Sequence, residues 1–124
     1  MVGRLSLART LLTAVILGAW QPVASAHAFL DHGEPGVGAD LTTSPQRIVL
    51  HFDSEIEAAF SGFLVQDKSG HEAARVQGQG DPADPAVLSL VLPGPLAPGV
   101  YKVLWSVIAR DGHHTEGDYT FTIH

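Results

Sequence analysis

The sequence contains no cysteine, and its single methionine is Met1. No disulfide can stabilise the chain, and no thiolate can act as a nucleophile or bind a metal ion. Glycine loops that cradle phosphates and the G-x-S-x-G motif of serine hydrolases are also absent. The sequence therefore offers no motif for hydrolysis or nucleotide binding. Any metal site must use nitrogen and oxygen ligands.

Basic residues are scarce: the chain has 7 Lys and Arg against 13 Asp and Glu, a formal net charge of −6. Two of the basic residues lie in the first 26 positions, so residues 27–124 carry five basic and thirteen acidic side chains, a balance of −8. This balance argues against binding to nucleic acid or to an anionic membrane surface. An acidic surface commonly serves solubility, so charge alone does not indicate a metal site.

Long apolar runs are missing as well. The apolar run from Leu11 to Trp20 is about half the ~20 residues that a membrane-spanning helix needs. Two arginines precede it and Ala24-Ser25-Ala26 follows it, the pattern of a Sec-type signal peptide with its cleavage site. We expect residues 1–26 to be removed and residues 27–124 to act in the periplasm, with no membrane span after cleavage. An uncleaved N-terminal anchor is the alternative.

The remaining chain has the period-two pattern of β-strands. In the strand expected over residues 47–52, Ile48, Leu50 and Phe52 alternate with Val49 and His51. In a longer strand, one face is formed by Tyr101, Val103, Trp105 and Val107. Further segments of this character, all bounded by Gly, Pro or Asp turns, span residues 62–67, 74–77, 87–92 and 119–123. No stretch predicts a helix. We expect one all-β domain, an antiparallel sandwich or barrel.

Histidine is unusually frequent, with seven residues at positions 27, 32, 51, 71, 113, 114 and 124. We interpret His32, His51, His71 and His124 as ordinary surface residues on strands, turns and the chain end. His27 is different, because cleavage after Ala26 would give it a free α-amine. That amine and the imidazole Nδ1 can close a chelate ring on one metal ion, and an α-amine with a pKa near ~8 loses its proton readily to a metal.

Asp111-Gly112-His113 offers complementary ligands. In an extended segment, residues i and i+2 point to the same face, so Asp111 and His113 would face one ion while His114 points away. Alone, this motif also fits a polar turn before the last strand. Together with His27 it gives three nitrogens and one carboxylate oxygen, a set that suits Cu²⁺, one per chain. Zn²⁺ would bind the same ligands more weakly, and Cu⁺ prefers sulfur.

The sequence resembles the CopC family of periplasmic copper-binding proteins over essentially all of residues 27–124. The matching motifs are His27-Ala-Phe-Leu30, Glu34-Pro35, Gly38-Ala-Asp-Leu41, Leu50-His-Phe52, Phe60-Ser-Gly62, the run from Pro98 to Val107, Asp111-Gly-His113, Gly117 and Phe121. The resemblance implies a seven-stranded Greek-key sandwich, immunoglobulin-like or cupredoxin-like, with a Cu²⁺ site at one end formed by His27, Asp111 and His113.

Two positions depart from the family pattern. Some members add a methionine-rich Cu⁺ site in mid-chain, but residues 66–74 contain no methionine. Some members place a glutamate near the copper just after the L-x-F strand, where this chain has Ser54 between Asp53 and Glu55. Whether any of these three residues approaches the metal is left open by the sequence.

The resemblance implies a non-enzymatic Cu²⁺ carrier or buffer in copper homeostasis, resistance or import. Its implied partner is a separate inner-membrane copper transporter (CopD-like), since residues 27–124 contain no spanning segment. Two alternatives remain open. One is a copper-dependent oxidative enzyme with a histidine brace, similar to lytic polysaccharide monooxygenases. The other is an immunoglobulin-like interaction module whose histidines are incidental.

Overall fold

The computed structural model describes residues 27–124, so the expected signal peptide lies outside the described residues. The described part contains eight strands and one short 3-10 turn. Their bounds are β1 Leu30–Glu34, β2 Asp40–Leu41, β3 Arg47–Phe52, η1 Ala58–Phe60, β4 Gly62–Asp67, β5 Glu72–Gln77, β6 Val87–Val91, β7 Gly99–Ile108 and β8 His114–Ile123. No helix in this part of the chain is long and apolar enough to cross a membrane.

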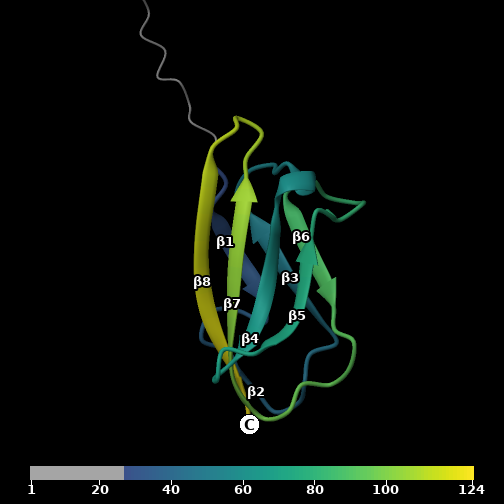
Figure 1. Cartoon of the computed structure of the whole chain (residues 1–124), viewed down its shortest axis with the longest axis vertical. Coiled ribbons are helices and arrows are strands. Elements are labelled where there is room, and N and C mark those ends of the chain that lie inside the picture. Colours follow the sequence, from purple (N-terminus) through teal and green to yellow (C-terminus); the bar gives the residue numbers. More distant parts are fainter. Residues whose placement is uncertain (1–26) are drawn as a thin grey trace, which may run out of the picture.

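The strands form two sheets that stack face to face (Figure 1). One sheet has the order β1-β3-β6 and the other has the order β2-β8-β7-β4-β5. Pairings between strands that are not consecutive, such as β3 with β6 and β4 with β7, are those of a Greek-key topology. The predicted all-β sandwich is confirmed. The expected count of seven corresponds to the strands of five or more residues in the described chain, and the two-residue β2 adds a parallel pairing with β8.

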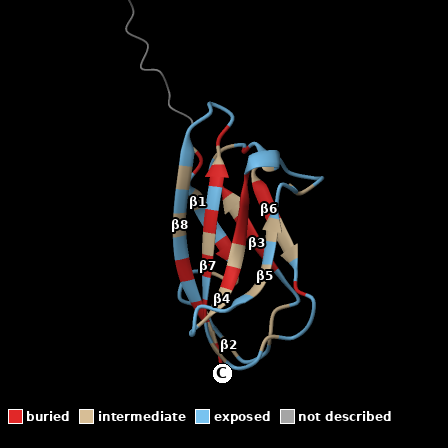
Figure 2. Ribbon diagram, viewed as in Figure 1, coloured by how far each residue is buried: buried red, intermediate tan, exposed pale blue. Residues whose placement is uncertain are grey.

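The core lies between the sheets and follows the alternation along each strand. Tyr101, Val103, Trp105 and Val107 are buried on the inner face of β7, as the sequence predicted, and the intervening residues are more exposed (Figure 2). Phe52 of β3 meets Trp105 edge to face across the two sheets, with ring centroids 5.4 Å apart. Aromatic pairs prefer edge-to-face or offset-stacked arrangements, and both rings bury a large apolar area here. This contact joins the two sheets across the core.

The bounds of β3 and β4 are those expected from the sequence, and β6 is one residue shorter. The sequence pattern missed β1 and the first half of β8. Both segments are rich in polar residues and glycine, so neither shows a clear apolar alternation. Their pairing with β3 and β7 stabilises them instead.

Gly117 of β8 makes room for the largest core side chain. It lies directly opposite Trp105 in the β7–β8 ladder. A Cβ at Gly117 would lie 2.6 Å from Cζ2 of the Trp105 indole, well inside contact distance. The indole therefore packs over the backbone of β8 because no side chain stands there.

We expect Gly117→Ala to lower the free energy of unfolding by about 1–3 kcal/mol, the usual cost of overpacking a core. Gly94→Ala is the matched control, because a Cβ at Gly94 meets nothing within 4 Å and its φ is not positive. The control should change stability by less than about 0.5 kcal/mol. Urea unfolding followed by Trp105 fluorescence measures both, and equal effects would contradict the packing described.

Candidate metal centre

The segment before β1 is fixed against the sandwich. Ala28 is fully buried and belongs to the core cluster. The Phe29 N–H donates to Oδ1 of Asp53 (2.8 Å), and the Asp53 N–H donates to the Phe29 carbonyl (2.9 Å). The Thr115 hydroxyl donates to the Ala28 carbonyl. These contacts place His27 between the segment that follows β3 and the start of β8.

The loop between β7 and β8 forms the other half of the candidate site. Gly112 has a φ of +87°, and its N–H donates to the Ala109 carbonyl (2.9 Å). Oδ1 of Asp111 accepts the His113 N–H (3.0 Å), a local bond typical of Asp in turns. The expectation that Asp111-Gly-His113 is extended is therefore wrong. The left-handed glycine and the Asp111 side chain close a turn there.

This turn is braced by the segment that follows β3. Ile56 pairs with Ala109 in an isolated antiparallel bridge, and both residues are buried. The Arg110 guanidinium forms an ion pair with Glu55 (2.7 Å), and the Arg110 N–H donates to the Glu55 carbonyl (3.3 Å). The start of the described chain, the β7–β8 loop and η1 all lie at the end of the sandwich opposite the C-terminus (Figure 1).

The structure brings His27, Asp111 and His113 together. Oδ2 of Asp111 is 3.8 Å from Nδ1 of His27 and 3.0 Å from Nδ1 of His113. The two imidazoles lie edge to face with centroids 4.3 Å apart. One ligand atom from each residue lies within 4.8 Å of the other two. Since metal–nitrogen and metal–oxygen bonds are about 2 Å long, small side-chain rotations would let all three bind one ion.

The chemistry of the donors fits a metal ion. Nδ1 of His27 is buried and has no hydrogen-bond partner among the described residues. A buried polar atom without a partner is costly, and native structures rarely leave one. A metal ion bound at Nδ1 would satisfy it. Nδ1 is also the imidazole nitrogen that can share a chelate ring with an α-amine on the same residue.

Asp111 supplies a negative charge. The backbone N–H of His113 holds its pKa below the usual aspartate value, assisted by the His113 side chain and by the positive charge that His113 and His27 can carry, while partial desolvation opposes the shift. Asp111 is therefore a carboxylate at neutral pH. Its side chain is 23% exposed, against 33% for His27 and 60% for His113, so the cluster opens to solvent on the His113 side.

His114 lies apart from the cluster. It begins β8 with its side chain on the exposed face of the five-stranded sheet, where Nε2 is 2.7 Å from the Ser106 hydroxyl and 4.0 Å from Glu116. The structure therefore places His113, and not its neighbour, beside Asp111.

Each of the three residues that follow β3 has its own hydrogen-bond or ion-pair partner. Asp53 accepts the Phe29 N–H, Glu55 pairs with Arg110, and the Ser54 hydroxyl donates to the His27 carbonyl (3.5 Å). Among residues 27–124, the histidine and carboxylate side chains that cluster at this candidate site are those of His27, Asp111 and His113. The Ser54 contact positions the backbone of His27.

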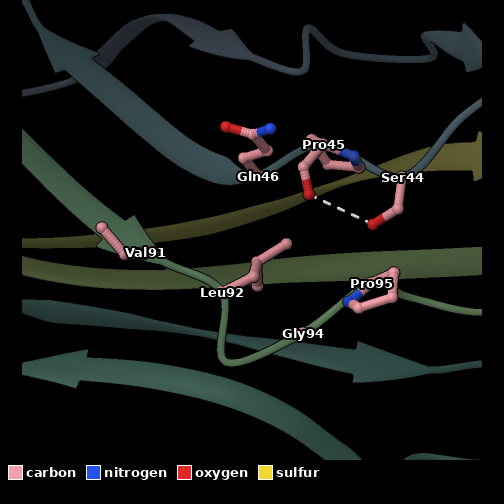
Figure 3. Close-up of a pocket in the computed structure, with 7 residues that line it drawn as sticks. All are labelled: Ser44, Pro45, Gln46, Val91, Leu92, Gly94 and Pro95. Carbon is pink, nitrogen blue, oxygen red and sulfur yellow. Dashed lines mark hydrogen bonds between the residues drawn. The ribbon is translucent and has the colours of Figure 1, made fainter.

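Two of the other histidines each face one carboxylate: His71 lies 3.5 Å from Asp67 and His124 lies 2.9 Å from Asp40. His32 and His51 differ. They form a second cluster with Glu34, which the sequence analysis missed because the grouping depends on strand register. A separate shallow pocket of about 400 Å³ carries no titratable side chain (Figure 3). It is lined by Ser44, Pro45, Gln46, Val91, Leu92, Gly94 and Pro95.

Comparison with known proteins adds the family. The model of the CopC domain matches residues 30–124. The chain belongs to the CopC family. Protein YobA of Escherichia coli K12 is 35% identical over 102 residues, which cover 82% of each chain. The crystal structure of CopC from Methylosinus trichosporium OB3b matches with a TM-score of 0.72 and 33% identity, over 78% of this chain and 93% of that one.

A second solved relative is PcoC of Escherichia coli, described as a methionine-rich copper resistance protein. It matches with a TM-score of 0.67 and 29% identity, over 80% of this chain and all of PcoC. This member of the CopC family differs in having Met1 as its single methionine. The family match begins at Leu30 and so leaves His27 outside it.

Proposed function

We propose that this CopC protein binds one Cu²⁺ per chain through His27, Asp111 and His113 once residues 1–26 have been removed. The observation that carries the proposal is the buried, unpartnered Nδ1 of His27 next to the Asp111 carboxylate and the His113 ring. The names of the relatives support the choice of metal, since PcoC is a copper resistance protein.

The donor set fits Cu²⁺ by its chemistry. The α-amine and Nδ1 of His27 would bind as one chelating unit, and the His113 imidazole and Asp111 carboxylate would add a nitrogen and an anionic oxygen. Cu²⁺ favours such nitrogen-rich tetragonal sets and has the highest affinity among the common divalent ions of the first transition row. The described chain contains no sulfur ligand that would favour Cu⁺.

The placement of the site favours a periplasmic carrier or buffer over an enzyme. His113 is more than half exposed, so an ion can enter and leave from that side without unfolding of the sandwich. Asp111 takes up coordination space that an oxygen-activating site would keep open for its substrate. We propose that the protein holds Cu²⁺ in the periplasm and exchanges it with a separate inner-membrane copper transporter of the CopD type.

Binding should depend on processing. The form that begins at His27 has an α-amine, whereas a form with Gly-Ser-Gly-Ser in front of His27 has an amide nitrogen there, which holds its proton far more tightly. We expect the extended form to bind the first equivalent of Cu²⁺ at least tenfold more weakly, which corresponds to about 1.4 kcal/mol or more. Competition titration against a chelator of known affinity measures this. Equal affinity in both forms would exclude the amine as a ligand.

His113→Ala and His114→Ala form a matched pair of neighbouring substitutions. Loss of His113 removes a nitrogen ligand, so Cu²⁺ affinity should fall by well over tenfold, and the electron paramagnetic resonance spectrum should show one fewer coupled nitrogen. Loss of His114 removes only surface contacts to Ser106 and Glu116, so affinity and spectrum should stay nearly unchanged. If His114→Ala were the more damaging change, His114 would have to turn inward, against the register of β8.

Copper affinity should fall as the pH drops below about 6. Protons compete with the metal for the imidazoles and the amine, and histidines ordinarily titrate near ~6.5. Asp111 does not set this limit, because its lowered pKa keeps the carboxylate ionised throughout that range. Titrations from pH 8 to pH 5 in a non-coordinating buffer test the direction. An affinity that rises or stays constant on acidification would contradict imidazole ligation.

A further inference from the structure

The second histidine cluster depends on an irregularity in β1. Leu30 pairs with Phe52 of β3, but the next paired residue on β1 is His32, opposite His51, so Asp31 is an extra, bulged residue. In a regular strand, Leu30 and His32 would point to the same face. The bulge reverses the parity, so Leu30 packs against the core while His32 points outward.

This reversal places three ligands on one patch of the outer face of the three-stranded sheet. Glu34 is two residues beyond His32 and shares its face, and His51 is the direct cross-strand partner of His32. β1 and β3 lie side by side at this point (Figure 1). The intervening Gly33 faces inward, as shown by the Tyr119 hydroxyl, which lies where a Cβ of Gly33 would be.

The side chains converge closely. The His32 and His51 rings are stacked, with centroids 4.1 Å apart and planes 9° apart. Because an imidazole binds a metal in its ring plane, at least one of these exposed rings would rotate out of the stack to aim both nitrogens at one ion. Oε1 of Glu34 is 3.6 Å from Nε2 of His51. One ligand atom of each of the three residues lies within 4.8 Å of the others. Two imidazoles and a carboxylate are the ligands that Zn²⁺ and Cu²⁺ accept in proteins.

Asp31, the bulged residue, supplies an outer contact. Nδ1 of His32 is 2.7 Å from Oδ2 of Asp31. Because a carboxylate accepts hydrogen bonds and cannot donate them, Nδ1 carries the proton in the neutral ring, and Nε2 is then the nitrogen whose lone pair a metal would bind. Metal-binding histidines usually have such a carboxylate or carbonyl partner, which fixes the tautomer and raises the basicity of the ligand nitrogen. The single bulge thus orients His32 and also supplies the group that prepares it to bind.

We propose that His32, Glu34 and His51 form a second metal site for a divalent ion of borderline hardness, Zn²⁺ or Cu²⁺, with Asp31 as the outer partner of His32. The site shares no ligand with the His27 cluster and needs no free amine. Its existence therefore does not depend on the function proposed above. With three protein ligands on an exposed face, it keeps coordination positions for water or for a ligand from another protein.

The test uses a form in which the His27 cluster is disabled by Gly-Ser-Gly-Ser in front of His27, which keeps His27 out of the third position where a free N-terminus would form a new Cu²⁺ chelate, and by His113→Ala. Isothermal titration with Zn²⁺ and, separately, with Cu²⁺ should show one ion bound per chain. His32→Ala and Glu34→Gln should each weaken that binding at least tenfold. Both residues are exposed, His32 by 54% and Glu34 by 66% of its side chain, so the variants should keep the unfolding transition of the parent.

His71→Ala is the matched control, since His71 is an exposed histidine 3.5 Å from a single carboxylate. This substitution should change the dissociation constant by less than twofold. The ratio of the Zn²⁺ and Cu²⁺ constants identifies the preferred ion. The proposal is overturned if neither ion binds with a dissociation constant below about 1 mM. It is also overturned if the dissociation constant of His32→Ala stays within twofold of the parent value, or if His71→Ala weakens binding as much as His32→Ala does. Because the first site is disabled throughout, none of these outcomes bears on it.

Discussion

The attachment of residues 27–29 to the sandwich is the constraint on which the candidate metal centre depends. Ala28 is buried in the core, and the paired hydrogen bonds between Phe29 and Asp53 extend the contacts of β1 and β3 by one step toward the chain start. A chain terminus without such contacts is ordinarily mobile. Here the attachment of residues 27–29 fixes the direction of His27, so the entropy cost of holding this candidate ligand is met by folding rather than by metal binding.

The opposite half of the site is fixed by different means. Asp111 and His113 lie on a turn, where backbone order is harder to maintain than in a strand, yet the Ile56–Ala109 bridge and the Glu55–Arg110 ion pair tie that turn to the segment after β3. The same segment contains Asp53, which holds Phe29. One stretch of chain therefore positions both halves of the cluster, and the relative placement of the ligands follows from it.

The sequence predicted what depends on alternation and on covalent chemistry. The inner face of β7, the bounds of β3 and the association of His27 with Asp111 and His113 were all accessible, the last through the chelating geometry of an N-terminal histidine and the family resemblance. Two features were not. The sequence predicts an extended segment where the structure has a turn at Gly112, because D-x-H fits both and only a positive φ separates them. It predicts ordinary surface residues at His32 and His51, because a one-residue bulge changes which face a side chain occupies without leaving any mark in the periodicity.

The two histidine clusters differ in what forms them, and this bears on how they could act together. As proposed, the His27 cluster binds its ion only in a cleaved chain, and it joins two segments, the start of the described chain and the β7–β8 loop. The His32 cluster consists of neighbours in a β-ladder and is complete as soon as β1 pairs with β3. His27 and His32 are five residues apart on one segment, so both clusters depend on the same docking of the chain start. A site with an amine–imidazole chelate should retain its ion longer than a three-ligand surface site. As proposed, the exposed and weaker site on the adjoining strand would exchange ions quickly with the surroundings, while the His27 cluster would retain its ion.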